Sequence, residues 1–195
     1  MDISTLCIHG SDDKTHSTGS ITVPIYQSAT FVHPGVGKST GYDYSRVQNP
    51  TREQLEIILT RLENGVDALA FSSGMAAITT VMELFHSGDH IIASDDLYGG
   101  SHRFFTHISM KNGITFDFVN TSDINEVVNH IRPETKAIFI ETPSNPMMKV
   151  TDIAAVSRIA KRYELLLIVD NTFLTPYFQN PISLGADIVI HSGTK

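Results

Sequence analysis

Short apolar runs alternate along this chain with amphipathic stretches, and no other feature of the sequence constrains the fold as strongly. Strand–helix alternation of this kind predicts an α/β layer structure with a mostly parallel sheet flanked by helices. At 195 residues the chain suffices for one principal domain with an additional arm. The apolar runs are 68–71, 90–93, 114–119, 137–140, 165–169 and 187–190, and the helical candidates between them lie at about 75–86, 100–110, 123–131 and 152–163.

Residues 1–50 differ from the rest of the chain, because they lack helical periodicity and are punctuated by prolines. We expect them to form an extended arm, and 51–195 to form the α/β domain. Thr51 with Gln54 has the pattern of a capping box, which predicts that a helix begins at Thr51 and ends at Asn64-Gly65. The apolar face expected for this helix consists of Leu55, Ile58, Leu59 and Leu62.

Charge and cysteine content exclude several classes of protein. The net charge is -7 and the Lys and Arg residues are scattered, so nucleic acid is not an expected partner. Cys7 is the only cysteine, which excludes an intrachain disulfide and indicates a reducing compartment. His86 and His90 are separated by an expected turn, so we predict no metal site. No apolar run is long enough to span a membrane, and we expect a cytoplasmic protein.

Ligands of open α/β sheets bind beyond the carboxyl ends of the strands, so the residues that follow each apolar run are the candidates for chemistry. Small and polar residues concentrate there. The four segments are 72–75, 141–146, 170–172 and 191–195.

The first and last of these segments have features of a phosphate site. Gly74 and Met75 follow an expected strand and open an expected helix, where backbone N–H groups and the helix dipole favour an anion. A tight turn without a ligand explains the same residues. Ser192 and Thr194 alternate along an expected strand end, so both hydroxyls could face one phosphate.

Asp170 and Lys195 could serve a cofactor with an electron-withdrawing ring. Asp170 ends the most apolar run, where a carboxylate could hold a protonated pyridine nitrogen, cap a helix or bind a metal. Lys195 follows a further strand, and its amine could form a Schiff base with a carbonyl or remain a solvated surface charge.

Taken together, the order and spacing of these segments resemble one family, the Cys/Met-metabolism enzymes that depend on pyridoxal 5'-phosphate (PLP). The resemblance covers nearly the whole chain and implies the large domain of a fold-type I PLP-dependent transferase. Enzymes of this family continue into a C-terminal domain that is absent here and that supplies the arginine for the substrate carboxylate. The matching segments are 44–46, 49–52, 72–77, 96–100, 141–146, 169–173 and 191–195.

The resemblance also implies roles for individual residues. Lys195 would bind PLP covalently and transfer protons, Asp170 would pair with the pyridinium nitrogen, and Tyr98 would stack on the ring and assist proton transfer. The phosphate would be bound by Gly74, Met75, Ser192 and Thr194, with Asn145 near the phenolic oxygen. Tyr44 and Arg46 would reach the phosphate of a neighbouring subunit, in a homotetramer built as a dimer of dimers.

Within this family the expected function is trans-sulfuration of small amino-acid substrates. Segments 97–101 and 165–175 resemble the cystathionine γ-synthase branch, which makes cystathionine from an activated homoserine ester and cysteine. Cystathionine γ-lyase and β-lyase remain alternatives. Methionine γ-lyase is disfavoured because it typically has a cysteine where Gly100 stands. A PLP-dependent aminotransferase and a non-enzymatic protein that retains the fold are further alternatives.

An ATPase is a remote alternative, because residues 34–40 look like a Walker A loop and 165–170 like a Walker B strand. The match fails at two points. The pattern requires glycine where Val32 stands, and Lys38-Ser39 should open a helix, which the following Gly41 and Pro50 disfavour.

Overall fold

The computed structural model describes residues 2–10 and 19–195. The chain divides into two compact units, Met1–Ala70 and Phe71–Lys195. Among the described residues, no helix combines the length and the apolar character needed to cross a membrane.

The first unit contains helices α1 (Ile3–His9) and α2 (Pro50–Glu63). Its described residues 19–49 are mostly irregular, with an isolated bridge between Thr30 and Tyr44. Helix α1 was not predicted, because it is only seven residues long and buries none of them, so it leaves no periodic signal.

The predicted start of α2 at Thr51 is wrong by one residue, and the cap is Asn49. The Asn49 side chain accepts a hydrogen bond from the Thr51 N–H at 2.9 Å, and Pro50 occupies the first helical position, where its fixed φ and missing N–H cost nothing. The Thr51 hydroxyl instead accepts from the Tyr26 N–H at 2.9 Å. The predicted end is confirmed, since Asn64 adopts a left-handed conformation. The expected apolar face is only partly covered, because Leu55 is 48% exposed while Ile58, Leu59 and Leu62 are half-buried.

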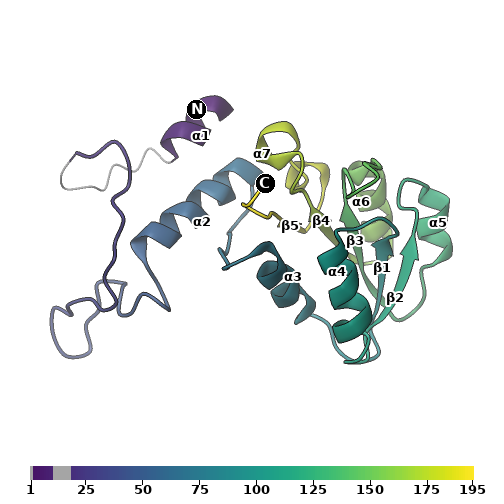
Figure 1. The fold of residues 1–195 in the computed structure, drawn as a ribbon, viewed down its shortest axis with the longest axis horizontal. Helices are drawn as coiled ribbons and strands as arrows, with labels where there is room; N and C mark the ends of the chain where they lie inside the picture. Colours follow the sequence, from purple (N-terminus) through teal and green to yellow (C-terminus); the bar gives the residue numbers. More distant parts are fainter. Residues whose placement is uncertain (1, 11–18) are drawn as a thin grey trace. The chain divides into compact units, whose positions relative to one another are not determined.

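The second unit is built on a parallel sheet of five strands in the order β2-β1-β3-β4-β5 (Figure 1). All neighbouring strands pair in parallel. Five of the predicted runs are therefore confirmed as strands. The strands are β1 (His90–Ser94), β2 (Thr115–Val119), β3 (Thr135–Glu141), β4 (Leu166–Asp170) and β5 (Ile188–Ile190).

The remaining prediction, a strand at 68–71, is wrong. A strand needs a neighbour for its backbone hydrogen bonds, and no described segment pairs with these residues. Leu69 is 69% exposed and Phe71 is 41% exposed, so the apolar run is not buried either.

The connections between strands are helical, as predicted. The region expected to be helical at 100–110 divides into α4 and a π-helical turn, η1, and the predicted 75–86 helix ends four residues early. A short α7 and a 3₁₀ turn, η2, were not predicted. The elements are α3 (Gly74–Met82), α4 (Gly99–Phe104), η1 (Phe105–Ser109), α5 (Ile124–Asn129), α6 (Ile153–Arg162), α7 (Thr175–Phe178) and η2 (Ile182–Leu184).

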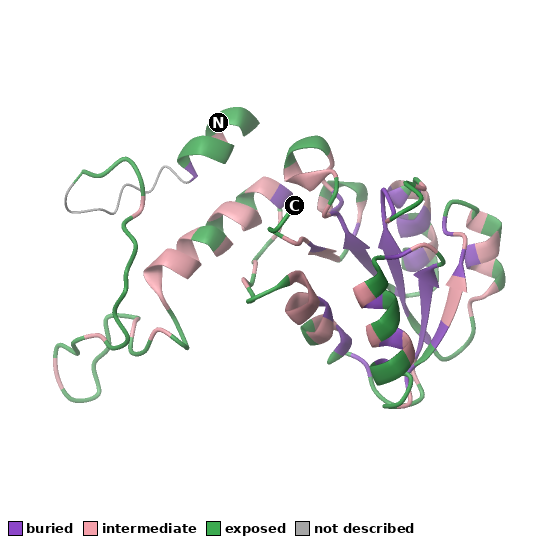
Figure 2. Cartoon of the chain, in the orientation of Figure 1, coloured by how far each residue is buried: buried purple, intermediate pink, exposed green. Residues whose placement is uncertain are grey.

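Helices cover both faces of the sheet, which gives three layers around two apolar clusters. On one face, Ile78 of α3 and Phe105 of η1 pack with Phe139 of β3, and the Phe105 ring lies 5.1 Å edge-on from the Phe139 ring. On the other face, Val127 of α5 and Val156 of α6 pack with alternate residues of the strands. The three central strands are therefore buried almost throughout (Figure 2).

The strand order places a topological switch point between β1 and β3. The chain leaves β1 toward β2 on one side of the sheet, and leaves β3 toward β4 on the other. Loops diverge at such a point and leave a crevice at the carboxyl ends of the strands, where ligands of doubly wound folds bind.

Candidate cofactor-binding site

A cavity of about 230 Å³ opens at the carboxyl ends of the strands, and all of its lining residues belong to the second unit. Every site residue that we predicted in this unit lines the cavity. The predicted residues are Gly74, Met75, Tyr98, Asn145, Asp170, Ser192, Thr194 and Lys195. The lining is completed by residues to which the sequence assigned no individual role, although four of them lie in candidate or matching segments. These residues are Ser73, Ile78, Glu141, Thr172, Phe173 and Ile190.

One end of the cavity is formed by the start of α3. The Ser73 hydroxyl accepts from the Ala76 N–H at 3.1 Å and caps the helix. In the described residues, the N–H groups of Gly74 and Met75 have no hydrogen-bond partner, so they remain available to an anion at the positive end of the helix dipole. Gly74 is required sterically, because a Cβ there would lie 2.9 Å from the Ser192 Cβ.

The hydroxyls of Ser192 and Thr194 come to this end from the loop after β5. Our prediction that they alternate along a strand is wrong, since β5 ends at Ile190. The Ser192 N–H donates to the Thr172 hydroxyl at 2.9 Å instead of continuing the sheet ladder. Both residues nevertheless line the cavity together with the start of α3.

Asp170 lies at the end of β4 and is 7% exposed. Its Oδ1 accepts two hydrogen bonds from Thr172, from the hydroxyl at 2.6 Å and from the N–H at 3.0 Å. Burial raises the pKa of the Asp170 carboxyl, and the Thr172 hydrogen bonds oppose that shift. A cationic group bound in the cavity would stabilise the ionised carboxylate, so the position fits a protonated ring nitrogen.

Glu141 is a second buried carboxyl at the same edge of the sheet. It ends β3 in register with Asp170 and is 6% exposed. Its Oε2 accepts from the Tyr98 N–H at 2.7 Å. Burial, followed by the charges of Asp170 and Asp96, raises the pKa of Glu141 to about 7, against the opposing hydrogen bond from Tyr98. The sequence placed Glu141 in the candidate segment 141–146, and an acidic residue directly after an apolar run is the signal that could have assigned it a role.

Tyr98 stands immediately before α4, and its position depends on Gly100. A Cβ at Gly100 would overlap the Tyr98 ring and lie 3.1 Å from the Met75 sulfur. The absence of a side chain at Gly100 therefore lets the Tyr98 ring lie over the start of α4, close to Met75 and beside the cavity.

Thr172 links the two ends of the cavity. Its hydroxyl donates to Asp170 and accepts from the Ser192 N–H. The signal in the sequence is a threonine two residues after an acidic strand end, a spacing at which the side chain folds back onto the carboxylate.

Tyr44 and Arg46 belong to the first unit and are outside the set of residues that line the cavity. The Arg46 guanidinium lies 4.6 Å from the centroid of the Tyr44 ring, a cation–π contact. Their predicted role at a neighbouring subunit stays a prediction.

In the part of the chain that the structure describes, no group of three or more His, Cys, Asp or Glu side chains could hold a metal ion. His90 is fully buried, and its Nδ1 lies 2.8 Å from the Thr135 hydroxyl oxygen.

The doubly wound sheet and this cavity define a cofactor-binding α/β domain. The cavity has an anion-binding site at one end and a buried carboxyl at the other. PLP fits these groups, because it carries a phosphate and a ring nitrogen that binds a proton. The chain belongs to the Cys/Met metabolism PLP-dependent enzyme family, whose model matches residues 4–195. The fold is that of the large domain of fold-type I PLP-dependent enzymes.

Individual relatives are trans-sulfuration enzymes. Cystathionine γ-lyase of Bacillus subtilis is 55% identical over 100% of this chain and 52% of its own length. Cystathionine γ-synthase/O-acetylhomoserine (thiol)-lyase of B. subtilis is 54% identical over 91% of this chain and 48% of its own. The crystal structure of cystathionine γ-lyase from Lactobacillus plantarum, complexed with L-serine, superposes with a TM-score of 0.93 at 46% identity, over 98% of this chain and 50% of that one. The chain thus spans about half the length of the curated relatives it matches.

Proposed function

We propose that the complete protein is a PLP-dependent trans-sulfuration enzyme that acts at the γ-carbon of its substrate. In the favoured reaction, γ-replacement, the sulfur of cysteine displaces the acyloxy group of an activated homoserine ester and forms cystathionine. The observation that carries the proposal is the convergence of Lys195, Asp170 and the start of α3 on one cavity, in a chain of this family.

When bound, PLP supplies an electron sink that stabilises negative charge on the amino-acid substrate. Asp170 would maintain that capacity by holding the proton on the ring nitrogen, because a cationic partner would stabilise the ionised form of this buried carboxyl. Lys195 would hold the cofactor covalently and exchange the proton at the substrate Cα. Tyr98 would cover the ring face and assist in proton transfer.

The remaining lining residues would hold and orient the cofactor. The N–H groups of Gly74 and Met75, with the hydroxyls of Ser192 and Thr194, would bind the phosphate at the start of α3. Asn145 would lie near the phenolic oxygen.

We also propose that residues 1–50 act as an arm in oligomer contacts and that 51–195 form the cofactor-binding domain. Tyr44 and Arg46 would then bind the phosphate in the neighbouring subunit of a homotetramer. The cation–π contact between them shows that the two side chains lie together in the arm, as joint binding of one phosphate requires. The single cysteine, Cys7, supports a cytoplasmic location.

Elimination is the second candidate reaction, because a γ-lyase and a γ-synthase match this chain at 55% and 54% identity. Both reactions concern the same Cγ–S bond. The outcome depends on whether a thiol attacks the γ-carbon before the carbon skeleton leaves as a 2-oxo acid and ammonia.

Product analysis of the complete enzyme tests the proposal. The enzyme is incubated with O-acetyl- or O-succinylhomoserine plus cysteine, and separately with cystathionine and water. We expect net cystathionine synthesis in the first reaction and slow release of cysteine, 2-oxobutanoate and ammonia in the second. Rapid cystathionine breakdown with little synthesis would identify a lyase. Lys195→Ala is the control and is expected to be inactive in both reactions.

A further inference from the structure

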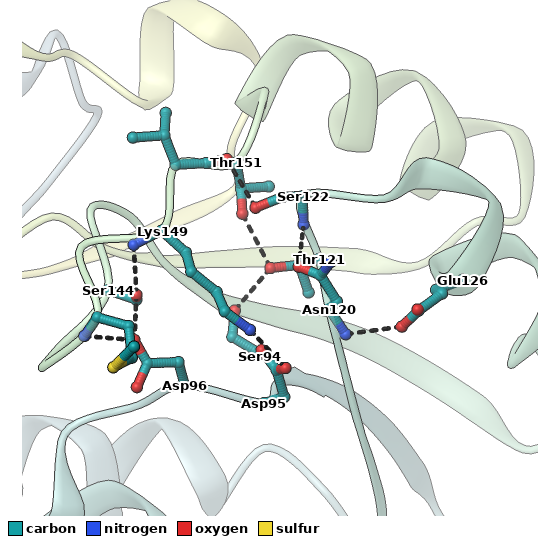
Figure 3. Close-up of polar contacts among 12 residues, drawn as sticks. Ser94, Asp95, Asp96, Asn120, Thr121, Ser122, Glu126, Ser144, Lys149 and Thr151 are labelled. Atoms are coloured by element: carbon teal, nitrogen blue, oxygen red, sulfur yellow. Dashed lines mark hydrogen bonds and ion pairs between the residues drawn. The ribbon is translucent and has the colours of Figure 1, made fainter.

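Two loops meet at the switch point between β1 and β3, and each carries a residue of the proposed site. The loop after β1 carries Tyr98, and the loop after β3 carries Asn145. Polar contacts between the two loops, drawn in Figure 3, connect residues 95 and 96 with residues 144–149.

Asp96 makes the central contacts of this group. Its Oδ2 accepts hydrogen bonds from the Ser144 hydroxyl and from the Met147 N–H, the latter at 2.9 Å. Ser144 is 2% exposed, and its oxygen also accepts from the Lys149 N–H at 2.9 Å. The Ser144 N–H donates to the Lys149 carbonyl at 3.0 Å, which closes the loop on itself. The Asp96 carboxylate, on the loop after β1, thus binds the closed loop after β3 through two hydrogen bonds.

The position of these contacts in the chain relates them to the site. Asp96 lies two residues before Tyr98, and Ser144 lies directly before Asn145. At the other end of the same loops, Glu141 accepts the hydrogen bond from the Tyr98 N–H. The two segments that enter the cavity are therefore cross-linked on both sides by carboxylates, and a shift of one would move the other.

The neighbouring acid, Asp95, offers a comparison within the same loop. Its carboxylate lies 2.7 Å from the Lys149 ammonium, but the two side chains are 37% and 38% exposed. Solvent-exposed pairs of this kind contribute little. Asp95 is thus exposed and pairs with an exposed side chain, whereas Asp96 is half-buried and accepts a hydrogen bond from the buried Ser144.

We infer that Asp96 is a positioning residue, which fixes the positions of Tyr98 and Asn145 relative to each other across the switch point. This inference rests on the proposed function, because it concerns the placement of two residues assigned there to the cofactor. Asp96 itself does not line the cavity and touches neither cofactor nor substrate in this assignment.

The first test needs neither cofactor nor substrate. In the cofactor-free complete enzyme, hydrogen–deuterium exchange is measured on the peptide that contains Met147 and Lys149. Asp96→Ala removes the acceptor of the Met147 N–H, so we expect its exchange to accelerate about tenfold or more. Asp95→Ala, the matched control, is expected to change exchange by less than about threefold.

The second test uses the enzyme loaded with PLP. We expect Asp96→Ala to lower kcat about 100-fold with a smaller change in KM, the scale expected for misplaced site residues, and to alter the visible circular dichroism of the bound cofactor. Asp96→Asn keeps one acceptor oxygen and should recover part of the loss. Asp95→Ala should retain the kcat and the spectrum of the unmodified enzyme.

Two results would overturn the inference. One is a folded Asp96→Ala enzyme whose kcat and visible dichroism match those of Asp95→Ala. If Asp96→Ala does not fold, Ser144→Ala is compared with Asp95→Ala in the same way. The other result is that neither Asp96→Ala nor Ser144→Ala folds, which would show a purely structural role. Should product analysis identify elimination instead of replacement, kcat is measured on cystathionine, and the exchange test is unaffected.

Discussion

Replacing Glu141 by glutamine should remove a pH-dependent loss of stability from the cofactor-free protein. Burial raises the pKa of this carboxyl from 4.5 to about 7, so the folded state binds its proton more tightly than the unfolded state does. The stability contributed by the protonated form is complete below pH 4.5 and is lost as the pH rises through 7. Glutamine is neutral at every pH, and its oxygen can still accept the hydrogen bond from the Tyr98 N–H.

The size of the effect follows from the shift. The pKa rises from 4.5 to about 7, and at 1.36 kcal/mol per pKa unit this rise corresponds to about 3 kcal/mol. Glu141→Gln should therefore match the original protein at pH 4.5 and exceed its free energy of unfolding by about 3 kcal/mol at pH 8. Asp170 also has a raised pKa because of burial, but it is present in both proteins, so their difference reports chiefly on Glu141.

Guanidinium denaturation of the two cofactor-free proteins between pH 4.5 and 8 measures this difference. Glu164→Gln, at an exposed glutamate, is the control and should change the free energy of unfolding by less than about 0.5 kcal/mol. A gap between Glu141→Gln and the original protein that stays constant over this range, or that widens toward low pH, would refute the reasoning.

Three further predictions concern the proposed cofactor site. Borohydride reduction of the holoenzyme followed by peptide mapping should place the pyridoxyl label on Lys195, and a label on another lysine would contradict that assignment. Gly100→Ala should displace the Tyr98 ring and lower kcat by about 10- to 100-fold, with a change in the cofactor spectrum, whereas an unchanged spectrum and rate would show that the ring position does not matter. Mixing inactive Arg46→Ala and Lys195→Ala enzymes should restore part of the activity if subunits exchange, and no recovery despite exchange would argue against an arm that acts on its neighbour.

The sheet was largely predictable from the sequence, for a physical reason. Strands buried on both faces leave continuous apolar runs, which is why β1, β3 and β4 stand out. The same signal led to the wrong prediction of a strand at 68–71, because an apolar run does not show whether a neighbouring strand exists to pair with it. Helix α1 left no signal, since it buries none of its residues.

The cavity was predicted mainly from motifs. Asp170 and Lys195 could be recognised by their place at strand ends, but each had an ordinary alternative until the family resemblance connected them. Glu141 and Thr172 lie in candidate segments but received no role, because their importance lies in contacts with residues far away in the sequence. Glu141 bonds to Tyr98 across 43 positions, and Thr172 bonds to Ser192 across 20. Local patterns contain no information about such pairs.

The Thr172 hydroxyl, which bonds to both Asp170 and Ser192, would determine how long a cofactor the proposed site accepts. Asp170 would receive the ring nitrogen and Ser192 the phosphate, and one threonine hydroxyl fixes the two residues relative to each other. A nitrogen and a phosphate carried on one small molecule can satisfy both ends only if their separation matches that spacing. Thr172→Val would release this constraint, so the site would lose discrimination between PLP and analogues with a longer phosphate arm.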